Sequence, residues 1–182
     1  MSETSSSLDQ RLIRAVRRDD AAAVERWLAA GADPERPDDR NGWTPLLHAV
    51  HKGSEAAAAA LLAGGAAPDT TGTGGQSPLL MAASYGDAAM IGALIAGGAD
   101  PYRGGQGWGN ALEAALTGAL DIDAFTFGRC QTAAVRTLLE HAPGLRPSSA
   151  VAGRLGPLIA YVRGCDEIEE LLATPPPPLP PL

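Results

Sequence analysis

Apolar residues along the chain gather in two kinds of short block, and both kinds recur at a fixed interval. The first kind contains a leucine pair, as in "PLLHAVHKGS" from residue 45 and "PLLMAASYGD" from residue 78. The second kind ends in glycine and a short polar close, as in "WLAAGADP", "LLAGGAAP" and "LIAGGADP", whose starts lie 34 and then 33 residues apart. A period of this length predicts a stack of similar units, each burying its apolar face against its neighbours.

Each unit predicts two short helices joined by a turn. Thr44 and Ser77 each precede a proline, which is the pattern of an N-cap followed by Pro at the first helical position. Asn110 holds the equivalent place in the next unit, and the first helices are expected to end near Gly53 and Gly86. The second helices are expected to end at left-handed glycines, namely Gly31, Gly65 and Gly98. The segments between units are rich in Gly, Pro, Asp and Thr and predict turns or a short hairpin.

These blocks resemble the repeats of the ankyrin family. Thr44-Pro45-Leu46 is similar to the Thr-Pro-Leu-His opening of that family, and "LIAGGADP" is similar to its Leu-Leu-x-x-Gly-Ala-Asp close. The resemblance is specific over residues 39–104, weakens toward the C-terminus and covers roughly residues 10–173. It implies an all-α ankyrin-repeat solenoid of about four to five helix-turn-helix units with hairpin-like loops.

The resemblance also divides the chain. We expect a disordered leader at 1–7, an ankyrin-repeat domain at 8–173 and a Pro-rich tail at 174–182. The units of the domain are placed at about 8–38, 39–71, 72–104, 105–146 and 147–173, the last of them degenerate. The tail is typical of polyproline II, which aromatic grooves of SH3, WW or profilin-like proteins recognise. An unrecognised flexible end is the simpler interpretation.

The fourth unit is longer than the others. Its leucine pair, Leu138-Leu139, lies 44 residues after Leu94-Ile95, which implies an insertion of about 11 residues near 119–129. The insertion carries three large apolar side chains, Ile122, Phe125 and Phe127. We expect them to fold back over the adjoining helices or to extend the first helix, because an exposed Phe forgoes roughly 1.5–3 kcal/mol of burial. The alternative is that the insertion is a partner-binding loop.

A binding surface is inferred from the resemblance and from the positions where residue type varies. In ankyrin proteins the first helices line a concave face and the hairpin tips extend from it, which implies a protein-binding groove there. His51-Lys52 align with Ser84-Tyr85 at the ends of the first helices, and variable residues on a fixed frame suggest contact. Trp43 lies just before a cap; the alternative for it is partial burial against the next hairpin. We predict a partner-binding set made of Arg40, Asn41, Trp43, His51, Lys52, Gln76, Ser84, Tyr85, Tyr102 and Trp108.

Two histidines raise the question of a metal site. His48 and His51 stand three residues apart, and from one helix both could reach an ion. The repeat favours a scaffold role, because the positions equivalent to His48 in the next two units hold Met and Ala. A metal site would need further donors, and neither Cys130 nor Cys165 has a Cys or His neighbour at ligand spacing. We therefore expect no metal, no cofactor, and a packed, hydrogen-bonded His48.

Charge and composition change this picture in a few respects. The net charge of −7 argues against nucleic acid as a partner. One local exception is a set of arginines on the first helix, interpreted as the polar outer surface that a terminal repeat needs: Arg11, Arg14, Arg17 and Arg18. An alanine run at 56–60 stands where the family usually has larger residues, so we expect the second unit to be the least stable. No apolar run reaches about 18 residues, and two cysteines 35 residues apart are typical of reduced thiols, which favours a cytoplasmic protein that does not engage membranes.

The function predicted from these features is non-catalytic binding of another protein by a monomer. One alternative is an inhibitory or immunity-like subunit whose acidic surface blocks a partner enzyme. A second is a small enzyme with its site at the insertion, where Asp121 and Asp123 form a carboxylate pair near aromatic residues. The identity of the partner is not encoded in any motif of the chain.

Overall fold

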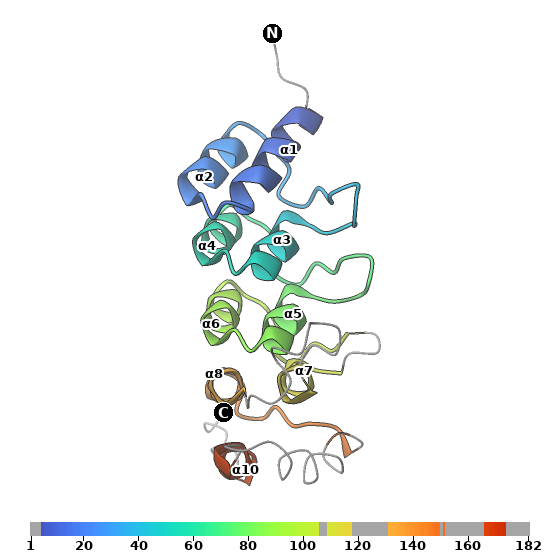
Figure 1. Cartoon of the computed structure of the whole chain (residues 1–182), viewed down its shortest axis with the longest axis vertical. Helices are drawn as coiled ribbons and strands as arrows, with labels where there is room; N and C mark the ends of the chain where they lie inside the picture. Colours follow the sequence, from blue (N-terminus) through green and yellow to red (C-terminus); the bar gives the residue numbers. More distant parts are fainter. Residues whose placement is uncertain (1–4, 106–108, 118–130, 150, 152–165, 174–182) are drawn as a thin grey trace, which may run out of the picture.

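The described residues form pairs of antiparallel helices stacked into an elongated solenoid (Figure 1). The computed structural model describes residues 5–105, 109–117, 131–149, 151 and 166–173. Figure 1 shows α1, α3, α5 and α7 in one column and α2, α4, α6 and α8 in a second, with the connecting loops projecting beyond the first column. The helices are α1 Ser5–Val16, α2 Ala21–Ala29, α3 Pro45–Lys52, α4 Glu55–Ala63, α5 Pro78–Tyr85, α6 Ala88–Ala96, α7 Ala111–Thr117, α8 Thr132–His141 and α10 Asp166–Ala173.

The predicted caps are confirmed. The Thr44 hydroxyl accepts a hydrogen bond from the backbone N–H of Leu47, and Ser77 does the same for Leu80. Asn110 caps α7 through its side-chain oxygen. The first helices end at Gly53 and Gly86, both left-handed, and the glycines after the second helices have φ of +94°, +92° and +97° at Gly31, Gly65 and Gly98. Sequence therefore fixes where most of these helices begin and end.

The N-terminal boundary differs from the expectation. Residues 1–7 were predicted to be a disordered leader, but α1 begins at Ser5. The helix carries Leu8 onto the core, ahead of the buried Leu12 and Val16, and its first three residues lie within the predicted leader. Residues 1–4 lie outside the described part of the chain.

One continuous core runs between the two columns of helices, and each of the first four units contributes at least one fully buried leucine. The second unit supplies less bulk than the third, because α4 buries Ala57 and Ala58 where α6 buries Met90 and Ile91. The largest fully buried side chains are Leu12, Leu46, Leu47, Leu61, Leu79, Leu80, Met81, Met90, Ile91, Leu94, Leu112 and Leu138. Among the described helices, none is long and apolar enough to cross a membrane.

Four carboxylates join consecutive units at three of the junctions, and they are called the cross-unit carboxylates below. Each accepts a hydrogen bond from a backbone N–H in the following unit, at 2.6–3.2 Å. The pairs are Asp19 with Ala57, Glu35 with Ala67, Asp69 with Asp100, and Glu113 with Ser148. Charged acceptors form the stronger kind of hydrogen bond, so these contacts fix the register of the stack as well as its spacing.

Two predicted segments cannot be compared with the structure. The insertion near 119–129 falls within residues 118–130, which lie outside the described residues, as does the Pro-rich tail from 174. Of the degenerate fifth unit, α10 is described and packs against α8, where Arg136 and Glu167 form an ion pair.

Candidate partner-binding site

Three rings from different parts of the sequence meet where α3 and α5 end. The Nδ1 atom of His51 lies 2.9 Å from the hydroxyl oxygen of Tyr85, in a hydrogen bond whose donor depends on the histidine tautomer. The Trp43 ring stands edge-on to His51, with 4.9 Å between ring centroids. We call Trp43, His51 and Tyr85 the ring cluster. The stacking of two successive units brings these rings together, and His51 and Tyr85 lie 34 residues apart, one more than the 33-residue step between these units.

The ring cluster is partly exposed and carries no net charge near neutral pH. His51 is exposed, whereas Trp43 and Tyr85 are half-buried. Partial burial, together with the nearby Lys52 ammonium, lowers the pKa of His51 below its ordinary value of 6.5. Burial raises the pKa of Tyr85 above 10.0. The cluster therefore offers large aromatic faces with neutral polar tips, a combination that is enriched at protein interfaces.

His48 lies behind this cluster and belongs to the scaffold. It is 6% exposed, and its ring stands edge-on to Trp43 at 5.6 Å. Its Nε2 atom lies 3.3 Å from Oδ2 of Asp38 but forms no hydrogen bond with a described residue. Burial lowers the pKa of His48, and the Asp38 carboxylate opposes this shift without cancelling it. The predicted packing of His48 is thus confirmed, while the predicted hydrogen bond is not seen in this part of the chain.

Asp38 holds the loop before α3 in place. Its backbone N–H donates to the carbonyl oxygen of Trp43 at 2.8 Å, and its carbonyl oxygen accepts from Gly42 at 2.7 Å. Its side chain accepts from the backbone N–H of Arg40. The loop is therefore closed on itself directly beside Trp43, which fixes the backbone that carries this ring.

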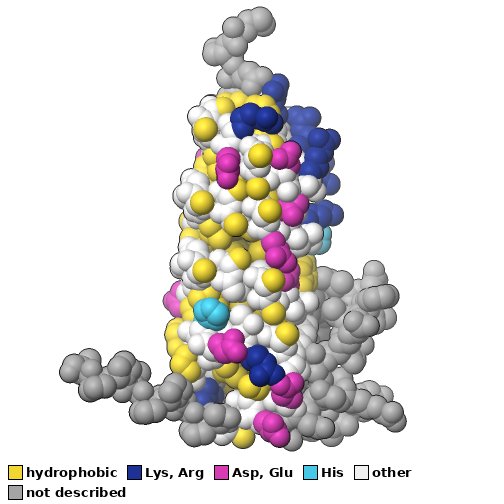
Figure 2. Space-filling model, turned by 90° about the vertical axis from the view of Figure 1, so that its left-hand side faces the viewer, with side chains coloured by type: hydrophobic (Ala, Val, Ile, Leu, Met, Phe, Trp, Pro, Cys, Tyr) yellow, Lys and Arg dark blue, Asp and Glu magenta, His cyan; other side chains and the backbone are white. Residues whose placement is uncertain are grey.

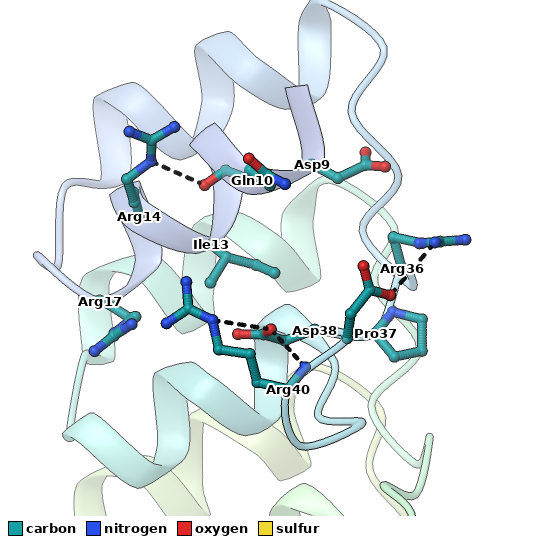
Figure 3. Close-up of a pocket in the computed structure, with 10 residues that line it drawn as sticks. Asp9, Gln10, Ile13, Arg14, Arg17, Arg36, Pro37, Asp38 and Arg40 are labelled. Carbon is teal, nitrogen blue, oxygen red and sulfur yellow. Dashed lines mark hydrogen bonds and ion pairs between the residues drawn. The ribbon is translucent and has the colours of Figure 1, made fainter. Parts of the chain in front are cut away.

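A pocket of about 400 Å³ opens between α1 and this loop (Figure 3). Figure 3 shows the side chains of Arg14, Arg17 and Arg40 on one side of it and those of Asp9 and Arg36 on the other. The pocket is lined by Asp9, Gln10, Ile13, Arg14, Arg17, Arg36, Pro37, Asp38, Asp39 and Arg40. Figure 2 shows Lys and Arg side chains gathered along one edge of the molecule near its N-terminal end. This part of the surface is basic although the chain carries a net charge of −7.

A family model described as "Ankyrin repeats (3 copies)" matches residues 12–104, just over half of the chain. The chain belongs to the ankyrin repeat family. No curated protein matches it. Ankyrin repeats are in general modules for protein–protein interaction, and this general role applies to the ankyrin-repeat chain. The matched residues run from within α1 through α6 and include the ring cluster and all the pocket-lining residues except Asp9 and Gln10.

The ankyrin-repeat fold brings together part of the predicted partner-binding set. Trp43, His51 and Tyr85 form the ring cluster. Gln76 lies half-buried before α5, and four further members of the set lie exposed in the loops or at the end of α3: Arg40, Asn41, Lys52 and Tyr102. Tyr102 is 56% exposed, and its loop lies one unit beyond the ring cluster. Trp108 lies outside the described residues.

Ser84 does not belong to this surface, which corrects the prediction. It is 1% exposed, its hydroxyl donates to the carbonyl oxygen of Met81, and its own carbonyl oxygen accepts from the Gln131 side chain. The alignment of the units correctly points to the C-terminal end of α5. The helical period of 3.6 residues, however, directs the Ser84 side chain toward the core and the Tyr85 side chain toward the surface. The sequence predicts a charged face that includes Arg14 and Arg17. It contains no motif that predicts the packing of the loop at 36–40 beside these two residues.

The described residues do not support a metal-binding site. Among the described residues, no group of three or more His, Cys, Asp or Glu side chains could hold a metal ion. His51, the possible partner of His48 in a metal site, is instead bonded to Tyr85.

Proposed function

We propose that the chain binds a partner protein through the face formed by α1, α3 and α5 and by the tips of their loops. The ring cluster is the observation that carries this proposal. Trp43, His51 and Tyr85 come from two units, contact one another and remain open to solvent on one side. Aromatic side chains are over-represented among residues that dominate binding energy, because they bury much area at low entropic cost.

The state of the free protein supports the same proposal. The His51–Tyr85 hydrogen bond and the edge-on contact with Trp43 already restrict all three side chains. Each rotamer-rich side chain that a partner must immobilise costs about 0.5–1.5 kcal/mol of binding free energy. A cluster ordered before binding avoids most of that cost, so it is suited to act as an anchor.

The test is a triple variant, Trp43→Ala, His51→Ala and Tyr85→Ala. A partner is first identified by pull-down and mass spectrometry, then purified and titrated calorimetrically against each protein. We expect the triple variant to lose at least about tenfold in affinity while its helical circular dichroism is retained.

The matched control is Trp27→Ala, which removes a half-buried tryptophan from α2, in the other column of helices. Its affinity should stay near that of the unchanged protein. Equal affinities for the triple variant and the unchanged protein would refute the proposed binding face.

We also propose that the chain acts as a cytoplasmic monomer without catalytic activity. Its family, whose repeats are typically non-catalytic, supports the last point. Sedimentation and cell fractionation test the other two. The enzyme alternative depends on the insertion near 119–129, and turnover in a hydrolase screen would be needed to favour it.

A further inference from the structure

The pocket between α1 and the loop at 36–40 is lined by four arginines, which differ in whether they form ion pairs. Two are paired with loop carboxylates: Nη2 of Arg36 lies 3.6 Å from Asp39, and Nε of Arg40 lies 3.9 Å from Asp38. Among the described residues, Arg14 donates only to the neutral carbonyl oxygen of Gln10, and Arg17 forms no ion pair. The pocket therefore holds positive charge that the described chain leaves uncompensated.

The carboxylates that line the pocket do not supply this compensation. Asp9 is 8% exposed and accepts the backbone N–H of Asp33. The Asp38 side chain is 14% exposed and is engaged by Arg40 and by the nearby His48 ring. Asp39 is open to solvent and lies beside Arg36. Because the two most buried acids already have partners within the fold, Arg14 and Arg17 remain available to an external anion.

The pocket adjoins the ring cluster through one residue. Asp38 lines the pocket, and its backbone N–H donates to the carbonyl oxygen of Trp43 at 2.8 Å. Figure 3 shows the Arg40 guanidinium between Arg17 and Asp38, on the side of the pocket away from Arg36. Positive charge and exposed aromatic surface thus lie next to each other on one face of the molecule.

We propose that this pocket binds the carboxylates of an acidic segment of the partner protein, with an adjacent apolar residue of that segment against the ring cluster. The inference rests on the proposed function and specifies the chemistry of the partner. Guanidinium groups suit carboxylates because their planar forks match the two carboxylate oxygens. A long nucleic acid fits less well, because a chain of net charge −7 repels a polyanion beyond this short basic surface.

The experiment uses fluorescence polarisation with three labelled probes: a decaglutamate peptide ending in leucine, its decaglutamine counterpart, and a single-stranded DNA of the same charge. The full chain should bind the glutamate peptide, should not bind the glutamine peptide, and should bind DNA more weakly than the glutamate peptide. Raising NaCl from about 50 to about 300 mM should weaken the glutamate complex, since exposed charges are screened over a shorter distance.

The decisive variant is Arg14→Gln with Arg17→Gln, which should bind the glutamate peptide about tenfold more weakly. The control with the same change in net charge is Arg26→Gln with Arg136→Gln, on α2 and α8, and it should stay within about twofold. Circular dichroism and melting curves establish that both proteins are folded.

Three results would overturn the inference: no binding of the glutamate peptide at low salt, equal affinity of the Arg14/Arg17 variant and the unchanged chain, or tighter binding of DNA. Measuring the affinity of both variants for the natural partner distinguishes failure of this inference from failure of the proposed function. If the ring-cluster variant loses the partner and the Arg14/Arg17 variant keeps it, the binding face stands and its acidic ligand does not. If both variants keep the partner, both proposals are wrong.

Discussion

Replacing Glu113 should weaken the junction between α7 and the turn that follows α8. This carboxylate is 7% exposed and accepts two backbone N–H groups, from Asn110 at 3.1 Å and from Ser148 at 2.6 Å. A hydrogen bond to a charged group contributes about 1.5–3 kcal/mol, which for two bonds is an upper limit of about 6 kcal/mol. Ser148 is exposed and Asn110 half-buried, so water can replace part of what is lost. We therefore expect Glu113→Ala to lower the free energy of unfolding by about 2 kcal/mol.

The pKa of Glu113 determines how the loss of stability in a Glu113 variant should change with pH. Burial raises the pKa of Glu113, but the hydrogen bonds from Ser148 and Asn110 outweigh it and leave the pKa below its ordinary value of 4.5. A carboxyl whose folded pKa is lowered stabilises the native state above its unfolded pKa. That stabilisation disappears as the pH falls through the folded pKa. The stability gap between the unchanged protein and Glu113→Gln should thus be full at neutral pH and shrink below about pH 4.

Urea unfolding followed by circular dichroism, at neutral pH and near pH 3, measures this gap. Glu140→Gln is the control, because Glu140 is an exposed carboxylate on the neighbouring α8. A gap for Glu113→Gln that stays constant across this pH range would show that the charge does not matter. A gap of zero at neutral pH would show that the two hydrogen bonds contribute nothing.

Two further predictions concern the second unit. Amide hydrogen exchange should be faster in α4 than in α6, because Ala57 and Ala58 replace two large side chains, each worth about 1.5–3 kcal/mol when buried; equal protection would mean that tight small-residue packing compensates. Asp19→Ala should lower the unfolding free energy by about 1–2 kcal/mol, since Asp19 caps α4 from the preceding unit and has a left-handed φ of +54°. Asp19→Asn keeps the acceptor and should be nearly neutral, so equal losses in the two variants would exclude a capping role.

The fold was predictable where its determinants are local. A hydroxyl residue before proline and a glycine after a helix act within one turn, so the caps at Thr44 and Ser77 could be placed from the sequence. The cap on α4 could not, because its own N-cap residue, Ser54, makes no side-chain hydrogen bond and the acceptor comes from Asp19, 38 residues before Ala57. Contacts of that kind depend on how units stack.

The candidate site shows the same division. The repeat pattern places Trp43 just before a predicted cap and His51 and Tyr85 at the ends of successive first helices, and the structure brings these three together. The basic pocket depends instead on how one loop folds back onto α1, which the period does not encode. From the sequence alone, Arg14 and Arg17 are therefore predicted to lie on an ordinary solvated face, and the structure is needed to show that the loop packs beside them.

The cross-unit carboxylates have a direction, and it bears on how the chain is made. In each of the four described pairs, the acceptor belongs to the earlier unit and the backbone donor to the later one. During synthesis from the N-terminus, every acceptor leaves the ribosome before the amide that it will bind. At these three junctions, the acceptor is therefore already synthesised when the later unit is added. Loss of the first unit would deprive its successor of two acceptors, whereas loss of the last unit removes only the donor that Glu113 binds and takes no acceptor from its predecessor.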